Sequence, residues 1–362
     1  IIELAQGEPD FNTPDHVIEA AYRAMHAGQT HYTPVDGTPE LKAAIAAKFR
    51  RENGLECQPA NISAGAGGKQ VLYNALMATL DPGDEVLIPA PSWVAYADIT
   101  HFAEGVPVWL PTKPEHGYKL RPEQLEDGIT PRAKWLMLNS PSNPSGAVYT
   151  AEELRALAAA LERHPSLWVI SDDMYEHVLF DGRPFATLAV VAPQLAARTL
   201  TVNGCSKTFA MTGWRLGYAC GPEELIRAMA RMQGQSSLNP SSVSQAAGVA
   251  ALNGPMDIVR SRCAEFQARR DFIVPRLNAI PGLACEAPHG AFYVYVSCAG
   301  WIGKANLNTD ADVTAHLLEN GVAVPNGAGY GLSPYFRVSF ASSLANLEEA
   351  CRRIAAAGEK LQ

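Results

Sequence analysis

The chain has 362 residues, more than one ordinary hydrophobic core organises, so we expect two domains that share a cleft. Hydrophobic residues make up 47% and charged residues 18% of the sequence, a composition that excludes a disordered protein. The net charge is -8 without any basic run, which argues against a nucleic-acid partner, and the longest apolar runs are strand-sized, which argues against a membrane span.

The seven cysteines are scattered, without a CxxC pair or a metal-ligand spacing. We therefore expect no metal, and reduced thiols in a reducing compartment, which predicts a cytoplasmic protein. The chain opens on Ile1-Ile2-Glu3-Leu4, without Met and already inside an apparent strand. We expect that the natural start is missing, and a removed targeting segment stays open.

Short apolar runs alternate with longer helical patterns, which is typical of a doubly wound, mostly parallel α/β sheet. Pro39 marks a helix start, and the breakers 81–84 stop the next helix. In chain order we expect helices at 39–52 and 69–80, strands at 85–88, 106–110 and 135–138, a helix at 151–163, strands at 167–170, 199–202 and 215–220, and helices at 223–233, 242–252 and 255–277.

The pattern after the last of these helices is different. Strands at 291–296 and 335–340 mix with helices at 310–320 and 344–357, as in a small α+β domain. We therefore predict a large domain of residues 17–265 and a small domain that combines residues 1–16 with residues 266–362.

Three polar residues follow three predicted strands: Asn143, Asp172 and Lys207. In an open parallel sheet, ligand-binding residues gather at the carboxyl ends of the strands, so these side chains should converge. They suit a pyridoxal ring, because Lys207 can join an aldehyde, Asp172 can keep a ring nitrogen protonated, and Asn143 can hold a ring oxygen together with Tyr175. Taken singly, each also has a plain structural explanation: a solvated loop charge, a helix cap or a turn.

Residues 204–217 read GCSKTFAMTGWRLG and resemble the pyridoxal-phosphate attachment motif of the class I and II aminotransferases. The spacing lets Lys207 reach the aldehyde carbon of the cofactor, while Arg215 folds back to pair bidentately with the cofactor phosphate. The resemblance covers nearly the whole chain and is strongest to the bacterial aspartate aminotransferases, some of which also act on prephenate. Further matching segments are Gly7-Glu8-Pro9-Asp10-Phe11, Tyr32-Thr33-Pro34, Gly67-Gly68-Lys69-Gln70, Trp93, Asn143-Pro144-Ser145-Gly146 and Arg337-Val338-Ser339-Phe340-Ala341.

The resemblance implies the aspartate aminotransferase-like fold (fold type I), the cofactor pyridoxal 5'-phosphate, and a homodimer with shared active sites. It implies that Lys207 attaches the cofactor and moves protons, that Asp172 pairs with the ring nitrogen, and that Tyr175 is the third catalytic residue. The remaining implied contacts are those of Tyr175 and Asn143 with the ring 3-oxygen, of Trp93 with the ring face, of Gly67, Gly68, Lys69, Ser206 and Arg215 around the phosphate, of Tyr32 with the partner's phosphate, and of Arg337, Gly7, Asn143 and Trp93 with the substrate.

Two of these sites also follow from the residues themselves. The helix at 69–80 leaves free N–H groups at the Gly67-Gly68 turn, which is a ready phosphate site. A nucleotide loop is the alternative, but Gln70 breaks the GxGxxG spacing and Ser63 breaks GxxxxGK. Arg337 in an apolar strand is costly unless it is paired, so we expect a carboxylate partner, either a substrate or a structural acid.

The substrate expectation rests on Lys69. Animal and enteric aspartate aminotransferases bind the distal carboxylate with an arginine before an Asn-Pro pair, and the stretch before Asn239-Pro240 has none. In the bacterial subgroup the lysine that matches Lys69 is thought to take that part, so we expect aspartate or glutamate as donor and 2-oxoglutarate as acceptor, in a ping-pong cycle. Ser92, where the subgroup often has Tyr, departs from the pattern.

Other functions stay open. Aromatic or prephenate-type substrates are one alternative, and a C–S lyase with the same Lys207 and Asp172 is another. A non-catalytic effector-sensing domain is a third, whereas a nicotinamide-dependent dehydrogenase fails on the glycine spacing.

Overall fold

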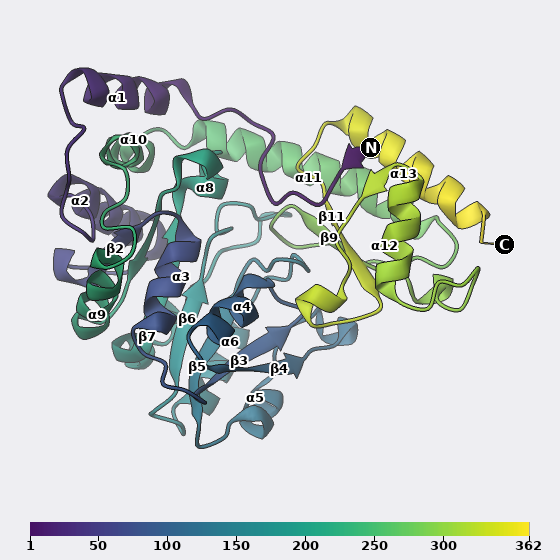
Figure 1. Ribbon diagram of the computed structural model, residues 1–362, viewed down its shortest axis with the longest axis horizontal. Helices are drawn as coiled ribbons and strands as arrows, with labels where there is room; N and C mark the ends of the chain where they lie inside the picture. Colours follow the sequence, from purple (N-terminus) through teal and green to yellow (C-terminus); the bar gives the residue numbers. More distant parts are fainter. Residues whose placement is uncertain (362) are drawn as a thin grey trace.

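In the computed structural model, which describes residues 1–361, a seven-stranded sheet forms the centre of the larger part of the molecule (Figure 1). The strand order is β2-β8-β7-β6-β5-β3-β4, and β8 (Gly217–Cys220) runs antiparallel to both of its neighbours. The other pairings are parallel. The remaining strands are β2 (Ile62–Gly65), β3 (Glu85–Ala90), β4 (Val106–Pro111), β5 (Ala133–Asn139), β6 (Trp168–Asp172) and β7 (Thr199–Gly204).

Helices cover both faces of this sheet, because successive side chains of a strand point to opposite sides. Val86 and Ile88 of β3 pack with α3 and α4, whereas Leu87 packs with α6. Burial on both faces explains why the parallel strands read as apolar runs. The helices of this part are α1 (Asp15–His26), α2 (Pro39–Lys48), α3 (Gly68–Met77), α4 (Ala95–Phe102), α5 (Pro122–Gly128), α6 (Ala151–Leu161), α7 (Leu188–Val191), α8 (Cys205–Thr208), α9 (Glu223–Gly234) and α10 (Ser242–Asn253).

The helix α11 (Asp257–Asn278) runs from this body toward a second group of elements, at the right of Figure 1. There β9 (Tyr293–Ser297) pairs antiparallel with β11 (Tyr335–Ser339), and α12 (Asp310–Glu319) and α13 (Leu344–Glu359) pack nearby. The first strand, β1 (Ile2–Glu3), pairs in parallel with β10 (Val322–Ala323). Both ends of the chain therefore meet in one lobe.

The expected elements are present, with shifted ends that have local causes. The helix predicted over 39–52 is α-helical to Lys48 and continues as the π-helical turn η1 (Phe49–Asn53). The strand predicted from 215 begins at Gly217, because Arg215 takes a left-handed conformation with φ 54°. The boundaries of the two domains stay a prediction. Within residues 1–361, no helix is both long and apolar enough to cross a bilayer.

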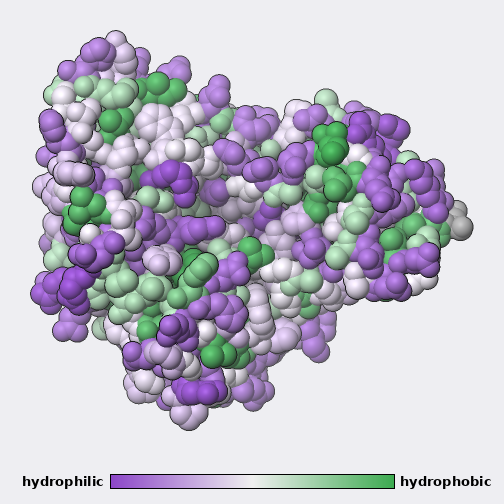
Figure 2. Space-filling view, viewed as in Figure 1, coloured by the Kyte–Doolittle hydropathy of each residue, from purple (hydrophilic) through white to green (hydrophobic). Residues whose placement is uncertain are grey.

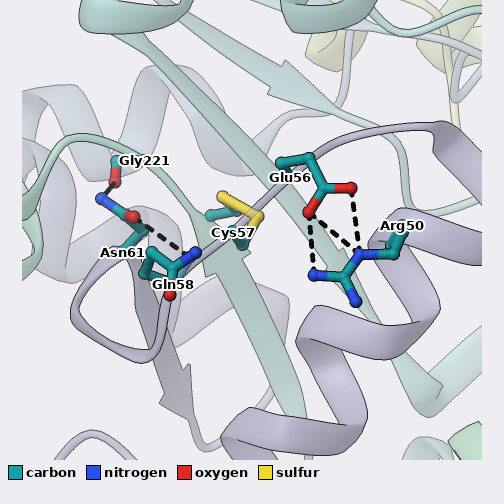
Figure 3. Close-up of a disulfide and its surroundings, with 7 residues drawn as sticks. Arg50, Glu56, Cys57, Gln58, Asn61 and Gly221 are labelled. Carbon is teal, nitrogen blue, oxygen red and sulfur yellow. Dashed lines mark hydrogen bonds and ion pairs between the residues drawn. A yellow bond between two sulfur atoms is a disulfide. The ribbon is translucent and has the colours of Figure 1, made fainter.

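One expectation was wrong: not all cysteines are free thiols. Cys57 and Cys220 form a disulfide between residues 163 positions apart, with their Cα atoms 6.5 Å apart (Figure 3). Cys57 lies just before β2, and Cys220 ends β8, the antiparallel neighbour of β2, so strand pairing brings them together. Spacing along the sequence gave no sign of this pair. The free cysteines of the described chain are Cys205, Cys263, Cys285, Cys298 and Cys351.

Candidate active site

A cleft of about 410 Å³ lies at the carboxyl ends of the sheet strands and is completed by residues of the N-terminal segment and of β11. This is where an open α/β sheet binds its ligands. Nearly all of the predicted site residues line it: Gly7, Gly68, Lys69, Trp93, Asn143, Asp172, Tyr175, Ser206, Lys207, Arg215 and Arg337.

Two predicted site residues do not line the cleft. Gly67 lies immediately behind it, against Arg215, so close that a Cβ atom on Gly67 would stand 2.6 Å from Arg215 Nη2. The side chain of Tyr32 is 87% exposed and makes no contribution to the cleft of its own chain.

Lys207 lies on the short helix α8, directly after β7. Its ammonium nitrogen donates a hydrogen bond to the carbonyl of Gly7. Desolvation lowers the pKa of Lys207 to about 8, although the nearby Glu8 acts in the opposite direction. A larger fraction of the amine is therefore uncharged near neutral pH than in an exposed lysine, as a nucleophile or proton carrier requires.

Asp172 ends β6 and is buried. One carboxylate oxygen accepts a hydrogen bond from the hydroxyl of Tyr96 at 2.6 Å, and the other accepts from the backbone N–H of Met174 at 3.2 Å. Burial raises the pKa of Asp172 to about 6, while the Tyr96 hydroxyl and the Met174 N–H pull it down. These donors favour the ionised form, which is the form that a pyridinium nitrogen would pair with.

Arg337 comes from β11. This strand belongs, with β9, α12 and α13, to the second group of elements, called the small lobe below, and the side chain of Arg337 lines the cleft. One guanidinium nitrogen donates to Asn143 Oδ1 at 2.9 Å and another to the carbonyl of Ala5, while the buried Nε has no partner. The guanidinium carbon lies 4.5 Å from the ring centre of Tyr293 and 5.2 Å from that of Tyr330. Within residues 1–361 no carboxylate pairs with Arg337, so the structural salt bridge that the sequence left open is absent.

The start of α3 forms the opposite wall. Gly67 precedes this helix with φ 90°, and no side chain caps its N-terminus, so the first N–H groups of α3 remain available to an anion. Arg215 folds back to the same place, where its guanidinium donates to the carbonyls of Thr212 at 2.9 Å and Ala66 at 3.4 Å. A positive helix end and a guanidinium thus face one corner of the cleft.

The model of the family described as Aminotransferase class I and II matches residues 1–354. The chain belongs to the class I and II aminotransferases. It is 55% identical to an aspartate aminotransferase of Rhizobium meliloti (strain 1021), over 100% of this chain and 90% of that protein. It is 54% identical to an aspartate/prephenate aminotransferase of Cereibacter sphaeroides, over 98% of this chain and 90% of the relative.

Solved structures of aminotransferases have the same fold. The crystal structure of the Rhizobium meliloti aspartate aminotransferase matches with a TM-score of 0.98 at 55% identity, over 100% of this chain and 92% of that one. The aspartate aminotransferase of Thermus thermophilus with maleate matches with a TM-score of 0.92 at 43% identity, over 99% of this chain and 91% of that one. The predicted family, the α/β fold of the aspartate aminotransferase-like transferases and the dependence on pyridoxal phosphate are thereby confirmed.

The aminotransferase cleft fits this cofactor. The unpartnered Nε of Arg337 and the uncapped start of α3 are two separate anion-seeking places in one cavity. Gly68 leaves room at the helix start, where a Cβ atom would stand 2.5 Å from Met174 Cε. Lys207 and Asp172 line the same cavity. The residues present therefore suit a phosphorylated pyridine aldehyde and the carboxylate of an amino acid.

The sequence reasoning missed several aromatic residues of the aminotransferase site. Tyr96, the partner of Asp172, lies on α4 three residues after Trp93, and a helix-spaced aromatic there looks like ordinary core. Tyr293 donates to or accepts from the hydroxyl of Tyr175 at 2.7 Å, and its place depends on the pairing of β9 with β11. No local signal indicates such a contact. Asn139, which accepts from the Asn143 N–H at 2.8 Å, follows the strand-end rule and could have been found by it.

Proposed function

We propose that this aminotransferase moves the amino group of a dicarboxylic amino acid, aspartate or glutamate, to a 2-oxo acid such as 2-oxoglutarate, in a ping-pong cycle. The observation that carries the proposal is one cleft in which Lys207, Asp172 and Arg337 converge, where the buried Nε of Arg337 has no partner within residues 1–361. Pyridoxal phosphate, when bound, supplies an aldehyde that joins amines and a ring that withdraws electrons from the α-carbon of the amino acid.

Lys207 is the proposed proton carrier. With a pKa of about 8, its Nζ exists partly as the free amine at neutral pH and can accept the α-proton of a bound amino acid. The ammonium so formed can return the proton to another carbon within reach, which makes the transfer reversible. Asp172, which accepts a hydrogen bond from Tyr96, would keep a proton on the ring nitrogen of the bound cofactor through its negative charge.

Arg337 is the proposed binding residue for the α-carboxylate. Asn143 and the carbonyl of Ala5 fix its guanidinium, and the rings of Tyr293 and Tyr330 flank it, so it is preorganised for a planar anion. Its position on the small lobe lets substrate binding favour closure of the cleft, which would exclude water.

Lys69 is the proposed partner of the distal carboxylate. Its ammonium nitrogen lies 5.0 Å from the ring centre of Trp93, and both side chains line the cleft. Arg215 and Lys207 are assigned to the cofactor, so Lys69 is the cation left beside Arg337 for a second carboxylate of the substrate, in line with the names of the relatives in Rhizobium and Cereibacter.

The assignment of Lys207 is tested with Lys207→Ala. Because this change removes both the attachment amine and the proton carrier, we expect turnover of aspartate with 2-oxoglutarate to fall by about a thousandfold or more. We also expect borohydride to fix the cofactor on wild-type residue 207 alone, as read by peptide mass. A variant that still transaminates at the wild-type rate would refute the assignment. A C–S lyase would instead release a β-substituent in a single turnover.

The substrate class is tested with Lys69→Met, which is one atom shorter, stays unbranched and removes the charge. We expect kcat/KM for aspartate to fall by roughly 10- to 100-fold, the effect of losing one charge pair, with a much smaller change for an uncharged amino acid. Equal losses on both donors would show that Lys69 serves only the phosphate corner. Prephenate, which the name of the Cereibacter relative includes, is the second acceptor to assay.

A homodimer is the proposed assembly. On α1, Val17, Ala21 and Ala24 are buried, yet Ile18, Tyr22 and Met25 on the neighbouring face are 45%, 59% and 49% exposed. Figure 2 shows hydrophobic surface at the upper left, where α1 lies in Figure 1. Such an outer apolar face suits a second copy of the chain.

The exposed Tyr32 follows α1, and in a dimer it would reach the partner's phosphate corner. The cytoplasmic location stays a prediction, and the Cys57–Cys220 disulfide removes part of the reasoning behind it.

A further inference from the structure

A cluster of buried polar side chains lies behind α8, outside the residues that line the cleft. Lys48 is 2% exposed and Glu176 is 4% exposed. The ammonium nitrogen of Lys48 contacts a carboxylate oxygen of Glu176 and donates to Asn53 Oδ1 at 2.8 Å. The amide of Asn53 donates to the other oxygen of Glu176 at 2.5 Å. The carboxylate of Glu176 is thus bonded at both oxygens.

His177 connects this cluster to the helix that carries Lys207. Its Nε2 lies 3.1 Å from Glu52 Oε2, and its Nδ1 lies 3.1 Å from the hydroxyl oxygen of Thr208. Thr208 is buried and directly follows Lys207 on α8. His177 itself lies in the loop after β6. The contact therefore joins that loop to the turn of Lys207.

The end of β6 and the loop after it hold the other two proposed catalytic residues. Asp172 ends β6, and Tyr175 stands two residues before His177. The hydrogen bond to Thr208 consequently fixes one catalytic element relative to the other, across 31 positions of sequence. The residues Lys48 and Glu52 anchor the arrangement from α2 and η1.

The charge of the two carboxylates decides which atom donates in the contact between His177 and Glu52. Burial opposes the ionisation of Glu176, but Lys48 and His177 together hold its pKa below the usual value. The pKa of Glu52 is also lowered. Burial alone would raise this pKa, but the interactions with His177 and Lys48 outweigh burial. An ionised carboxylate only accepts, so Nε2–H of His177 donates to Glu52. On the other side of the ring, Nδ1 lies 3.1 Å from the Thr208 hydroxyl oxygen and 3.5 Å from Glu176 Oε1.

The groups Glu52, Glu176 and His177 lie close enough together to resemble a metal site. Lys48, however, already provides a cation at Glu176 and lies 3.8 Å from Glu52. A divalent ion would have to displace a buried ammonium from its partners. The cluster is therefore an internal network, not a cation site.

We propose that His177 is a positioning residue: through Thr208 it sets the direction in which α8 presents Lys207 to the cleft that Asp172 and Tyr175 also face. Buried ion pairs add little net stability compared with apolar packing, so we assign this network a role in geometry. The inference rests on the proposed function, in which Lys207 attaches the cofactor and carries the proton.

The matched variants are Thr208→Val, which removes the hydroxyl at nearly constant volume, and Thr208→Ser, which keeps it. In Thr208→Val we expect kcat to fall about tenfold with KM changed less than about twofold, because misplacement of Lys207 acts on the proton transfer. Thr208→Ser should retain kcat within about twofold. His177→Phe should resemble Thr208→Val.

A second measurement needs no turnover. The apoenzyme is treated with acetic anhydride over a range of pH, and acetylation of Lys207 is followed by peptide mass. We expect the dependence of Lys207 acetylation on pH to shift in Thr208→Val and His177→Phe but not in Thr208→Ser. Unchanged profiles together with wild-type kcat would refute the proposal, as would equal losses in Thr208→Val and Thr208→Ser. Shifted profiles in a protein that never transaminates would refute the proposed function instead.

Discussion

At the scale of single residues, the hydrogen bond from Tyr96 to Asp172 stabilises the ionised form of the Asp172 carboxyl. Burial raises the pKa of Asp172 to about 6. The pKa would be higher still without the Tyr96 hydroxyl, because this donor stabilises the carboxylate. The carboxylate is present above this pKa and is lost as the pH falls through it. The cofactor affinity of the apoenzyme should therefore decline below about pH 6.

Tyr96→Phe removes this donor and leaves the ring in place. We expect the pKa of Asp172 to rise by about one unit, so the decline in cofactor affinity should begin about one pH unit higher. The measurement is the dissociation constant of pyridoxal phosphate across pH, read by quenching of tryptophan fluorescence. Asp172→Asn is the control, since it has no group to titrate there. If the affinity for pyridoxal phosphate declines at the same pH in the wild type and in Tyr96→Phe, the prediction is contradicted.

At the scale of elements, β8 presses against the start of α3. A Cβ atom on Gly217 would stand 2.2 Å from the backbone nitrogen of Gly68, whereas one on Gly213 would meet nothing within 4 Å. Backbone cannot move aside as a flexible side chain can. The close approach of β8 therefore determines where the phosphate corner lies.

Gly217→Ala should push α3 away from β8. We expect the free energy of unfolding to fall by about 1–3 kcal/mol, the usual effect of overpacking, together with weaker binding of pyridoxal phosphate. Chemical denaturation and cofactor titration measure the two effects. Gly213→Ala, in the same segment, is the matched control and should alter neither. Wild-type affinity in Gly217→Ala would contradict this account of the corner.

The long alternating pattern of apolar runs was enough to predict β3 to β7 and most of the larger helices, but the 12-residue helix α1 was not predicted. The element β2 escaped because it has four residues that end on Gly65, and the short α5 has no room for a helical period. The family resemblance, of which the motif around Lys207 is the most specific part, identified eleven of the residues that line the cleft, and their roles stay predictions. The tyrosines and the disulfide needed tertiary contacts: Tyr293 reaches the site through β9, and Cys57 meets Cys220 through strand pairing.

At the scale of the whole molecule, the proposed dimer makes a prediction about mixed subunits. Lys207→Ala subunits lack the amine, and Tyr32→Ala subunits lack the residue that we expect to serve the partner's site. A dimer with one subunit of each kind has one site with both wild-type residues and one with neither.

Random mixing of these two subunits should restore about a quarter of the wild-type sites, because half of the dimers are mixed and each has one intact site. The activity should exceed the sum of the two separate variants after joint refolding. Sedimentation of the wild type as a dimer is the accompanying check. Activity equal to that sum would show that Tyr32 serves no partner.

The pairing of β1 with β10 bears on how the chain folds as it is made. Ile2 lies beside Val322, and the backbone N–H of Ser339 donates to the carbonyl of Leu4 at 2.9 Å. During synthesis, residues 2–4 must therefore stay unpaired until Val322 and Ser339 have been made. The carbonyl to which Arg337 donates belongs to Ala5, 332 positions earlier in the sequence, so the substrate-binding geometry can form only after both segments have been synthesised and brought together.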